Sequence, residues 1–472
     1  MSQRHGRRSR ESYAAIACLF VGCLLVAAAI AQESAPLQAA VATEETAAGE
    51  SAPVGEQAHS AEQAHSGEQV ARIARLISEL GAESQSRRDR ATAELARLGD
   101  APADALRRAA ASLDSEVSLR ARELLAEIAV ERLWRASQVS GLAGRCATAS
   151  ALGVIREQTG NTLLVGTAYG TLNDVEVQLG DAQGAFWPLM DELCRQSGNR
   201  VRPHYDTRAP GLIVTAGEPG RNPLAYAGPL RAQITSARRV FIEEVDYEKL
   251  ASDLKHTFQL NLQVMWEDRF RLVAYRTEPQ LVEARTDTFV ALSAAQQAAG
   301  GWSIPNAGTR QVTLSLRLAP PPATACELSV LRLTWGVVAV GDLATIEVDE
   351  LEPPVVHRQD DVELTVESIE SRSSGRYDVT LLVNRGLVLP EPQEVLYQEN
   401  EIELYDAAGQ PFRKEGQSNS LSAAGARLKV TFRGASAESA PARLVLTYPR
   451  IRSERDVEIV FRNVPLPVAR LE

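Results

Sequence analysis

The sequence predicts a multi-domain α+β protein in which N-terminal helical hairpins precede a small αβ module and then two antiparallel β-sandwiches. Three observations support this order. Hydrophobic residues recur at helical spacing after residue 70, helices and strands alternate between 146 and 217, and strict two-residue alternation dominates from 224 onward. A chain of 472 residues is also too long for one core, so several domains are expected.

The first residues have the features of a secretory signal peptide. A basic start precedes an uncharged apolar run, 14–31, which ends in the small-x-small pattern of Ala29-Ile30-Ala31. We therefore predict a cleaved signal over 1–31 and export to the periplasm, the cell envelope or the outside. The alternative is an uncleaved membrane anchor, because about 18 apolar residues can just span a bilayer.

The net charge of the chain indicates which class of macromolecule it is expected to bind. The chain is 44% hydrophobic and 24% charged, as is typical of soluble globular proteins. Its net charge is −11, and removal of 1–31, with four arginines and one glutamate, makes the mature chain more acidic. An acidic protein repels phosphate backbones, so a protein partner in the envelope is expected rather than a nucleic acid.

Residues 32–69 are predicted to form a disordered tether. The segment contains no aromatic residue and repeats Glu-Gln-Ala-His-Ser in tandem, at 56–60 and 62–66. So little apolar area cannot offset the entropy of ordering the chain. The two histidines of the repeat, His59 and His65, are interpreted as part of a spacer rather than as metal ligands.

A helical domain is predicted over 70–140. Four short amphipathic segments follow one another, and tight turns between them indicate antiparallel packing. Gly81 and Gly99 are placed to end the first two helices, Pro102 suits the first turn of the third, and Asp114 or Ser115 can cap the fourth.

This region carries a resemblance to HEAT-like helical repeats of bacterial proteins. The matching stretch is LISELGAESQSRRDRATAELARLGDAPADALRRAAASLDSEVSLRARELLAEI, in which an Arg-Ala pair opens a helix, Leu-Gly ends it and Asp-Ser-Glu-Val begins the next unit. In that family the repeats form interaction surfaces. The resemblance therefore implies that this domain contacts a protein.

A small αβ module is predicted over 146–217. A helix, a Gly-Asn turn and a strand occur twice, around Gly160-Asn161 and Gly198-Asn199, and each glycine can take the left-handed conformation that ends a helix. The stretch VEVQLGDAQGAFWPLMDELCRQSGNRVRPHYDTRAPGLIVTAG resembles the short N-terminal domain of secretins and TonB-dependent receptors. This resemblance implies a module that docks protein partners in the periplasm.

Two β-sandwiches are predicted over 224–350 and 355–472, separated by a linker at Glu352-Pro353-Pro354. Alternating apolar residues mark their strands, for example along 258–266 and 428–432. Residues 247–256 are expected to be a helical insertion. The C-terminal half resembles uncharacterised exported bacterial β-sandwich proteins, and the second sandwich has an immunoglobulin-like strand pattern without the paired disulfide and central Trp.

The side chains suited to catalysis are scattered along the sequence. His204, His256 and His357 lie in different segments without a known catalytic motif beside them. We predict that the chain is not an enzyme. A hydrolase whose triad assembles across domains is the alternative, because triad members need not be close in sequence. His204, at a strand end, is kept as a possible ligand contact.

No cofactor or metal site is predicted. The acidic clusters 349–352 and 360–363 could offer oxygen ligands to calcium, but at strand and linker boundaries they are better explained as solubilising edges. After signal removal Cys146, Cys194 and Cys326 remain. They are interpreted as buried apolar side chains, with a Cys146–Cys194 disulfide as the alternative.

Aromatic residues suggest one further class of ligand. Phe186-Trp187 begins a helix and is expected to be core, whereas Trp302, in a loop after two glycines, is expected to be exposed. Trp302 is therefore the candidate contact if the sandwiches bind carbohydrate. The favoured function remains a non-enzymatic interaction scaffold of the envelope.

Overall fold

The computed structural model describes residues 55–467 with short internal gaps. The residues not described within this range are 143, 166–167, 181–183, 205–210, 249–250, 296–299, 307, 361, 374, 385–399, 423–424 and 437. The expected signal segment, 1–31, lies outside the described residues. The chain divides into two compact units, Met1–His65 and Ser66–Glu472, and every contact below lies within the second.

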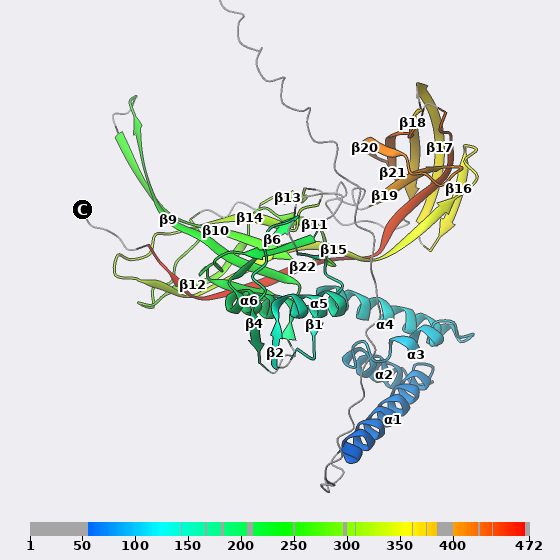
Figure 1. The fold of residues 1–472 in the computed structure, drawn as a ribbon, viewed down its shortest axis with the longest axis horizontal. Coiled ribbons are helices and arrows are strands. Elements are labelled where there is room, and N and C mark those ends of the chain that lie inside the picture. The colour runs from blue at the N-terminus through cyan, green and yellow to red at the C-terminus, as the bar shows by residue number, and fades with distance from the viewer. Residues whose placement is uncertain are drawn as a thin grey trace, which may run out of the picture. The chain divides into compact units, whose positions relative to one another are not determined.

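The described residues form a β-rich chain with several sheets and six helices (Figure 1). The prediction of a β-rich, multi-domain chain is thereby confirmed at this level. Of the described helices, none combines the length and apolar character needed to cross a bilayer.

Four helices open the described chain. They are α1 (Gly55–Glu79), α2 (Gln85–Arg97), α3 (Ala103–Ala109) and α4 (Ser115–Trp134). The carboxylate of Asp114 caps α4 by accepting hydrogen bonds from the backbone N–H groups of Glu116 (2.9 Å) and Val117 (3.2 Å). The apolar faces of the four helices share one core, which contains Ile73, Leu76, Leu80, Ala91, Leu95, Leu106, Ala121, Leu124 and Ile128.

Helix α1 corrects the expected extent of the tether. It begins at Gly55, so the C-terminal part of the segment predicted to be disordered, 55–69, is helical. The low apolar content of this part suggested disorder. However, its Ala, Glu and Gln residues are strong helix formers, and they continue directly into the amphipathic turn that packs in the core.

The αβ module follows α4. Its elements are β1 (Gln138–Val139), β2 (Gly144–Ala147), α5 (Thr148–Thr159), β3 (Leu163–Leu164), β4 (Glu176–Leu179), β5 (Gly184–Ala185), α6 (Phe186–Ser197), β6 (Asn199–His204) and β7 (Gly211–Ala216). Strands β3, β7 and β6 form one sheet, while β2–β4 and β1–β5 form two-stranded ladders. Both helices end as predicted on a left-handed glycine, Gly160 (φ 67°) and Gly198 (φ 66°).

Two sheets enclose the next core. A four-stranded sheet, ordered β14-β10-β9-β8, contains β8 (Leu224–Ala227), β9 (Leu230–Asp246), β10 (Ala251–Trp266) and β14 (Gln311–Leu318). Opposite lie β11 (Arg271–Arg276), β12 (Gln280–Thr286), β13 (Trp302–Ser303) and parts of β15 (Glu327–Val348) and β22 (Pro441–Pro465). Alternate residues of β10, from Phe258 to Trp266, are buried in this core.

The helix expected over 247–256 is wrong. Strands β9 and β10 pair from Asp246↔Ala251 to Leu230↔Trp266, with one register shift between Asn261 and Leu262, so 251–256 belong to β10 near the end of a long hairpin (Figure 1). The charged residues of the segment suggested a helix. An adjacent antiparallel strand overrides that propensity because it satisfies the backbone N–H and C=O groups residue by residue.

A second β-rich core lies further along the chain. It is covered by a five-stranded sheet, ordered β16-β17-β18-β21-β20. These strands are β16 (Val355–Gln359), β17 (Val362–Ser373), β18 (Arg376–Asn384), β21 (Gly425–Arg433) and β20 (Arg413–Ser422). Strand β19 (Glu401–Asp406) pairs with β22 on the opposite side of the core.

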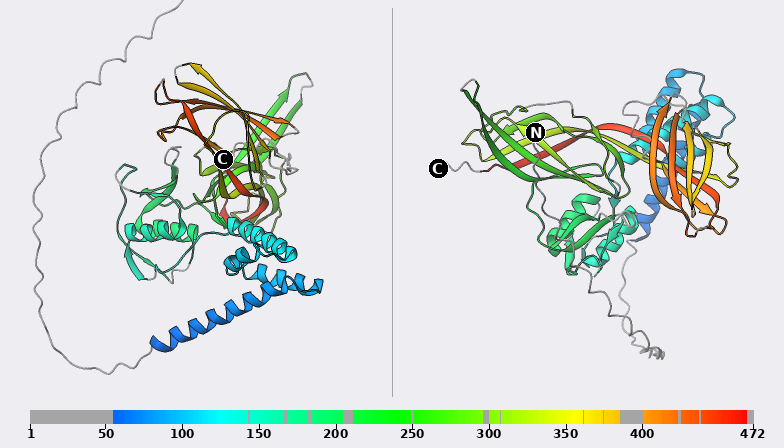
Figure 2. Two further views of the ribbon diagram at one scale, coloured as in Figure 1. Left: turned by 90° about the vertical axis from the view of Figure 1, so that its right-hand side faces the viewer. Right: turned by 90° about the horizontal axis from the view of Figure 1, so that it is seen from above.

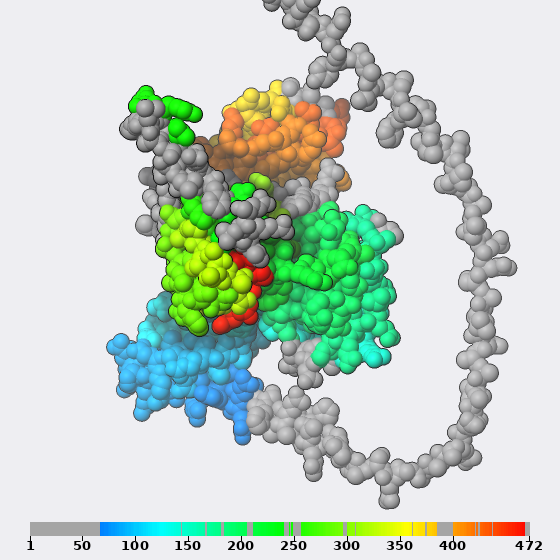
Figure 3. All heavy atoms as spheres, turned by 90° about the vertical axis from the view of Figure 1, so that its left-hand side faces the viewer, coloured from blue at the N-terminus to red at the C-terminus, as the bar shows by residue number. Residues whose placement is uncertain are grey.

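A boundary between two sandwich domains was expected between 350 and 355. The last strand, β22, does not respect this boundary, because it contributes to both β-rich cores. Strands β15 and β22 pair along their length, from Glu327↔Pro465 to Val348↔Leu444. The first part of β22 contributes Leu444, Leu446 and Tyr448 to the second core, and its later part returns to the first. Figure 2 shows this red strand running from one sheet to the other, and Figure 3 shows its end beside the first core's strands.

Candidate functional site

His204 lies at the end of β6, in the αβ module. Its ring meets the ring of Tyr169 edge to face, with the centroids 5.3 Å apart, and the side chain is half-buried. Tyr205 and Asp206, which follow it, lie outside the described residues. His204 and Trp302 belong to different sheets, and no contact joins the two candidate residues in the described part of the chain.

Trp302 is half-buried rather than exposed in a loop. It stands in β13, where the guanidinium of Arg276 stacks on its ring at 4.4 Å from the centroid, and it packs with Ile304 on Ala274 and Val338. An aromatic platform for a sugar needs an open ring face. Arg276 already occupies one face of this ring, so the exposure expected for Trp302 is not found.

Phe186 and Trp187 are buried in the core of the αβ module, as expected. The indole N–H of Trp187 donates to the carbonyl oxygen of Pro229 at 2.9 Å. Because Pro229 lies between β8 and β9, this bond joins helix α6 to the four-stranded sheet.

The acidic cluster at 360–363 takes part in ion pairs. Asp360 accepts hydrogen bonds from the Tyr448 hydroxyl (3.1 Å) and from Arg450 Nε (2.9 Å), and Glu363 accepts one from Arg358. Asp361 lies outside the described residues. In the part of the chain that is described, no three His, Cys, Asp or Glu residues gather as metal ligands would.

The three cysteines differ in their surroundings. Cys194 is buried in α6, Cys146 is half-buried, Cys326 is exposed, and all three are free thiols. The expectation of three buried side chains is therefore right only for Cys194. Burial, with a smaller contribution from the Asp191 carboxylate and against the opposing effect of Arg231, raises the pKa of the Cys194 thiol to about 12.

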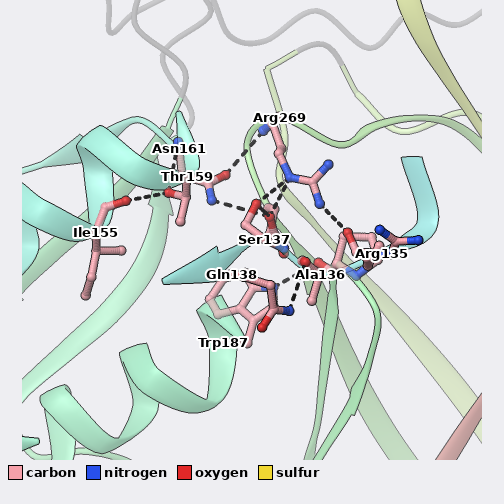
Figure 4. A network of polar contacts seen from close by, with 11 residues as sticks. Arg135, Ala136, Ser137, Gln138, Ile155, Thr159, Asn161, Trp187 and Arg269 are labelled. Carbon is pink, nitrogen blue, oxygen red and sulfur yellow. Dashed lines mark hydrogen bonds and ion pairs between the residues drawn. The ribbon is translucent and has the colours of Figure 1, made fainter. Parts of the chain in front are cut away.

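A buried carboxylate, Glu267, joins three parts of the fold through Ser137, Asn161 and Arg269, which are labelled in Figure 4. Its side chain is fully buried and accepts from the backbone N–H of Ser137 (2.9 Å), the Ser137 hydroxyl and Arg269 Nε (2.8 Å). The amide of Asn161, at the end of α5, donates to the same carboxylate at 3.4 Å. Ser137 follows α4, Asn161 belongs to the αβ module, and Glu267 directly follows β10.

Arg269 completes this junction. Its guanidinium also donates to the carbonyl oxygen of Arg135, and its backbone N–H donates to the side-chain oxygen of Asn161 at 3.3 Å. Neither Glu267 nor Arg269 was expected from the sequence to be a site residue. The available signal was a run of charged residues directly after the alternating strand 258–266, which is also what an ordinary surface turn looks like.

A second buried ion pair fastens α6 to the four-stranded sheet. Arg231, on β9, contacts Asp191 through two parallel bonds, from Nε (2.7 Å) and Nη2 (2.9 Å). The Tyr226 hydroxyl donates to the same carboxylate at 2.8 Å. Desolvation and the nearby Asp191 charge raise the pKa of Tyr226, which keeps its proton available for this bond.

The end of α4 is fastened to β22. The indole N–H of Trp134 donates to the Ser453 hydroxyl at 2.9 Å, and Arg455 stacks on the same indole while pairing with Glu131. The Trp134 ring also meets Phe270 edge to face at 5.3 Å. Helix, αβ module and sheets are thus joined by buried polar and aromatic contacts.

A cleft of about 640 Å³ lies along the seam between the two β-rich cores. Two of its arginines are paired, Arg271 with Glu401 (3.1 Å) and Arg310 with Asp268 (2.6 Å). Neither His204 nor His256 is among its lining residues. Because acidic and basic side chains both line the cleft, Glu403 and Lys414 among them, it has no predominant charge of one sign for recognising a ligand.

Comparisons with known proteins add little to this geometry. No family model matches the chain, and no curated protein matches it. One solved structure that does match is a conserved domain protein from Bacillus anthracis, which is 9% identical, with 51% of this chain and 89% of that chain covered. Its TM-score is 0.16, a similarity too low to support any inference.

Proposed function

We propose that this chain is an exported, non-enzymatic scaffold that binds a protein partner in the cell envelope. The observation that carries this proposal is the buried junction around Glu267. A fully desolvated carboxylate is costly unless it is paired and hydrogen-bonded, and here its partners come from different parts of the chain. A chain that holds its modules in a fixed arrangement presents their outer surfaces in a fixed arrangement too.

The helical block supplies the docking surface in this proposal. A groove of about 250 Å³ between α3 and α4 has an apolar floor formed by Leu125, Ile128 and Ala129. Acidic and basic side chains surround it, and they are Asp100, Asp104, Arg107 and Arg132. An apolar floor with a charged rim is the pattern of a protein-binding groove.

The finer architecture belongs to the same proposal. Helices α2–α4 would act as HEAT-like hairpins that present this groove, and 146–217 would act as the docking module that its resemblance to secretin N-terminal domains implies. The free surface of the αβ module is then the part away from Asp191 and Trp187, since those residues bind it to the four-stranded sheet.

The test uses the whole protein as bait in chemical cross-linking and affinity capture from an envelope extract. Ala129→Arg fills the groove floor, whereas Ala126→Arg adds the same charge on the same helix outside the groove. We expect the unchanged protein and Ala126→Arg to recover the same partner, and Ala129→Arg to lose it. Equal recovery by both variants would exclude the groove, and recovery of no protein at all would contradict the scaffold.

A further inference from the structure

The outer face of the four-stranded sheet carries three rows of polar side chains. Residues 258, 260, 262 and 264 of β10 point into the core, so the residues between them point outward. The strand register then places three residues side by side in each row. The rows are Gln233–Gln263–Thr313, Ser236–Asn261–Ser315 and Arg238–Gln259–Arg317.

Hydrogen bonds hold the central residues of these rows in place. Asn261 donates to Ser236 (2.8 Å), while its side-chain oxygen accepts from Ser315 (3.0 Å) and Gln259 (3.1 Å). Arg238 donates to Gln259 at 3.1 Å. Side chains that neighbours already orient lose little conformational entropy when a ligand binds.

The charge of this face is opposite to that of the protein. The whole chain carries a net charge of −11. Among the nine residues of the three rows there are two arginines, Arg238 and Arg317, and no carboxylate. Both arginines are exposed, and they flank the same glutamine.

The αβ module bounds the face at one end. The next row along the strands contains Arg231, Met265 and Gln311. Arg231 is bound to Asp191 of α6, and Met265 is buried in the core of the αβ module. The face is therefore a polar surface that ends at a neighbouring module.

We propose that this face binds a polysaccharide that carries carboxylate groups. Amides and hydroxyls in fixed positions can donate to and accept from sugar hydroxyls, and the two exposed arginines can each bind a carboxylate. Rows two residues apart repeat at about 7 Å along the strands, so the face suits an extended, repeating ligand.

A protein partner fits this face less well. The centre of a protein interface is enriched in aromatic and apolar side chains, and none of the nine row residues is of that kind. This proposal depends on the outer face of the four-stranded sheet, whereas the protein-binding proposal depends on the groove between α3 and α4. The two proposals are therefore independent. Failure of either proposal leaves the other unaffected.

The experiment measures binding of the whole protein to polygalacturonate by isothermal titration calorimetry. Fully methyl-esterified polygalacturonate, which keeps the backbone and loses the charge, is the comparison. The double variant Arg238→Gln/Arg317→Gln removes the two charges but keeps amide donors. Arg462→Gln is the control, since Arg462 is an exposed arginine on β22. Thermal melting of each variant verifies that it folds.

We expect the unchanged protein to bind polygalacturonate at least about tenfold more tightly than its ester. The double variant should lose about tenfold in affinity for polygalacturonate, Asn261→Ala should weaken both ligands, and Arg462→Gln should change neither by more than about twofold. The proposal is overturned if neither polymer binds. It is also overturned if the acid and the ester bind equally, or if Arg462→Gln weakens binding as much as the double variant.

Discussion

The buried carboxylate of Glu267 is surrounded by hydrogen-bond donors from three segments. Two of these donors come from Ser137, one from Asn161 and one from Arg269. Removal of the charge would leave these groups without their strongest acceptor, at a junction where the Glu267 side chain is fully buried. A single buried residue that is hydrogen-bonded to several segments therefore contributes strongly to the stability of the contacts between modules.

Substitution of Glu267 should show this directly. We expect Glu267→Gln to lower the free energy of unfolding by about 2–4 kcal/mol, since buried donors lose a charged acceptor. Glu367→Gln is the matched control because Glu367 pairs with Arg427 at the surface, and its loss should stay below about 1 kcal/mol. Urea unfolding followed by tryptophan fluorescence measures both, and equal losses would contradict the role given to Glu267.

Cys194 provides a prediction about reactivity and pH. Because burial raises the pKa of its thiol to about 12, Cys194 should resist iodoacetamide in the native protein while the exposed Cys326 reacts. A raised pKa in the folded state stabilises the protein below the ordinary pKa of a thiol, and this stability is lost as the pH rises toward 12. The Tm of the unchanged protein should therefore fall more steeply above pH 9 than that of Cys194→Ala. Rapid native labelling of Cys194, found by mass spectrometry of the labelled peptides, would show that α6 is not packed as described.

At the scale of elements, sequence patterns correctly predicted the features that depend on residues close together in the sequence. The alternation of 258–266 and the glycines that end α5 and α6 were interpreted correctly, because strand faces and helix ends follow from local geometry. The stretch 247–256 was interpreted wrongly, because its conformation depends on pairing with β9. The positions of Trp302 and of Glu267 likewise depend on elements far away in the sequence.

The contact between α4 and the β8–β9 turn gives a test at this scale. A Cβ at Gly228 would lie 2.1 Å from the Trp134 carbonyl oxygen, and its φ is +55°. We expect Gly228→Ala to lower the free energy of unfolding by about 2–4 kcal/mol, through overpacking and backbone strain together. It should also expose the bonds after Arg132 and Arg135 to trypsin.

Gly409→Ala separates the two causes. Gly409 also has a positive φ, +74°, but no other atom lies within 4 Å of the place that an added Cβ would take. Only the backbone strain therefore applies, and it should cost about 1 kcal/mol. Comparable destabilisation in the two variants would mean that α4 does not press against the turn.

At the scale of the whole molecule, β15 and β22 connect the two β-rich cores. Each strand contributes apolar residues to both, so neither core is closed by one continuous stretch of sequence. The division expected at 350–355 followed from a proline-containing linker, and such a signal marks a turn between strands as readily as a domain boundary. The strand that completes the first core comes from the far end of the chain.

Removal of the last strand segment should test this connection. A chain that lacks 450–472 loses Val457, Ile459, Phe461 and Val464 from the first core. Each such side chain contributes roughly 1.5–3 kcal/mol, and together they match the stability of a typical domain. We expect Trp266 and Trp335, buried in that core, to lose their cooperative fluorescence transition. A chain that lacks only 468–472 should keep it, and an intact transition in the longer truncation would show that the first core closes without β22.

The sequence by itself determined the order of the parts, the alternation of the strands and the ends of the helices, because these depend on residues within one or two turns of each other. The tertiary structure alone decided that 251–256 pair as part of β10, that β22 returns to the first core and that Glu267 is buried at a junction. It also decided that the polar residues of three strands line up in rows. The physical reason is that strand pairing and burial of charge are interactions between distant segments, and their energies exceed the local preferences that a sequence pattern reports.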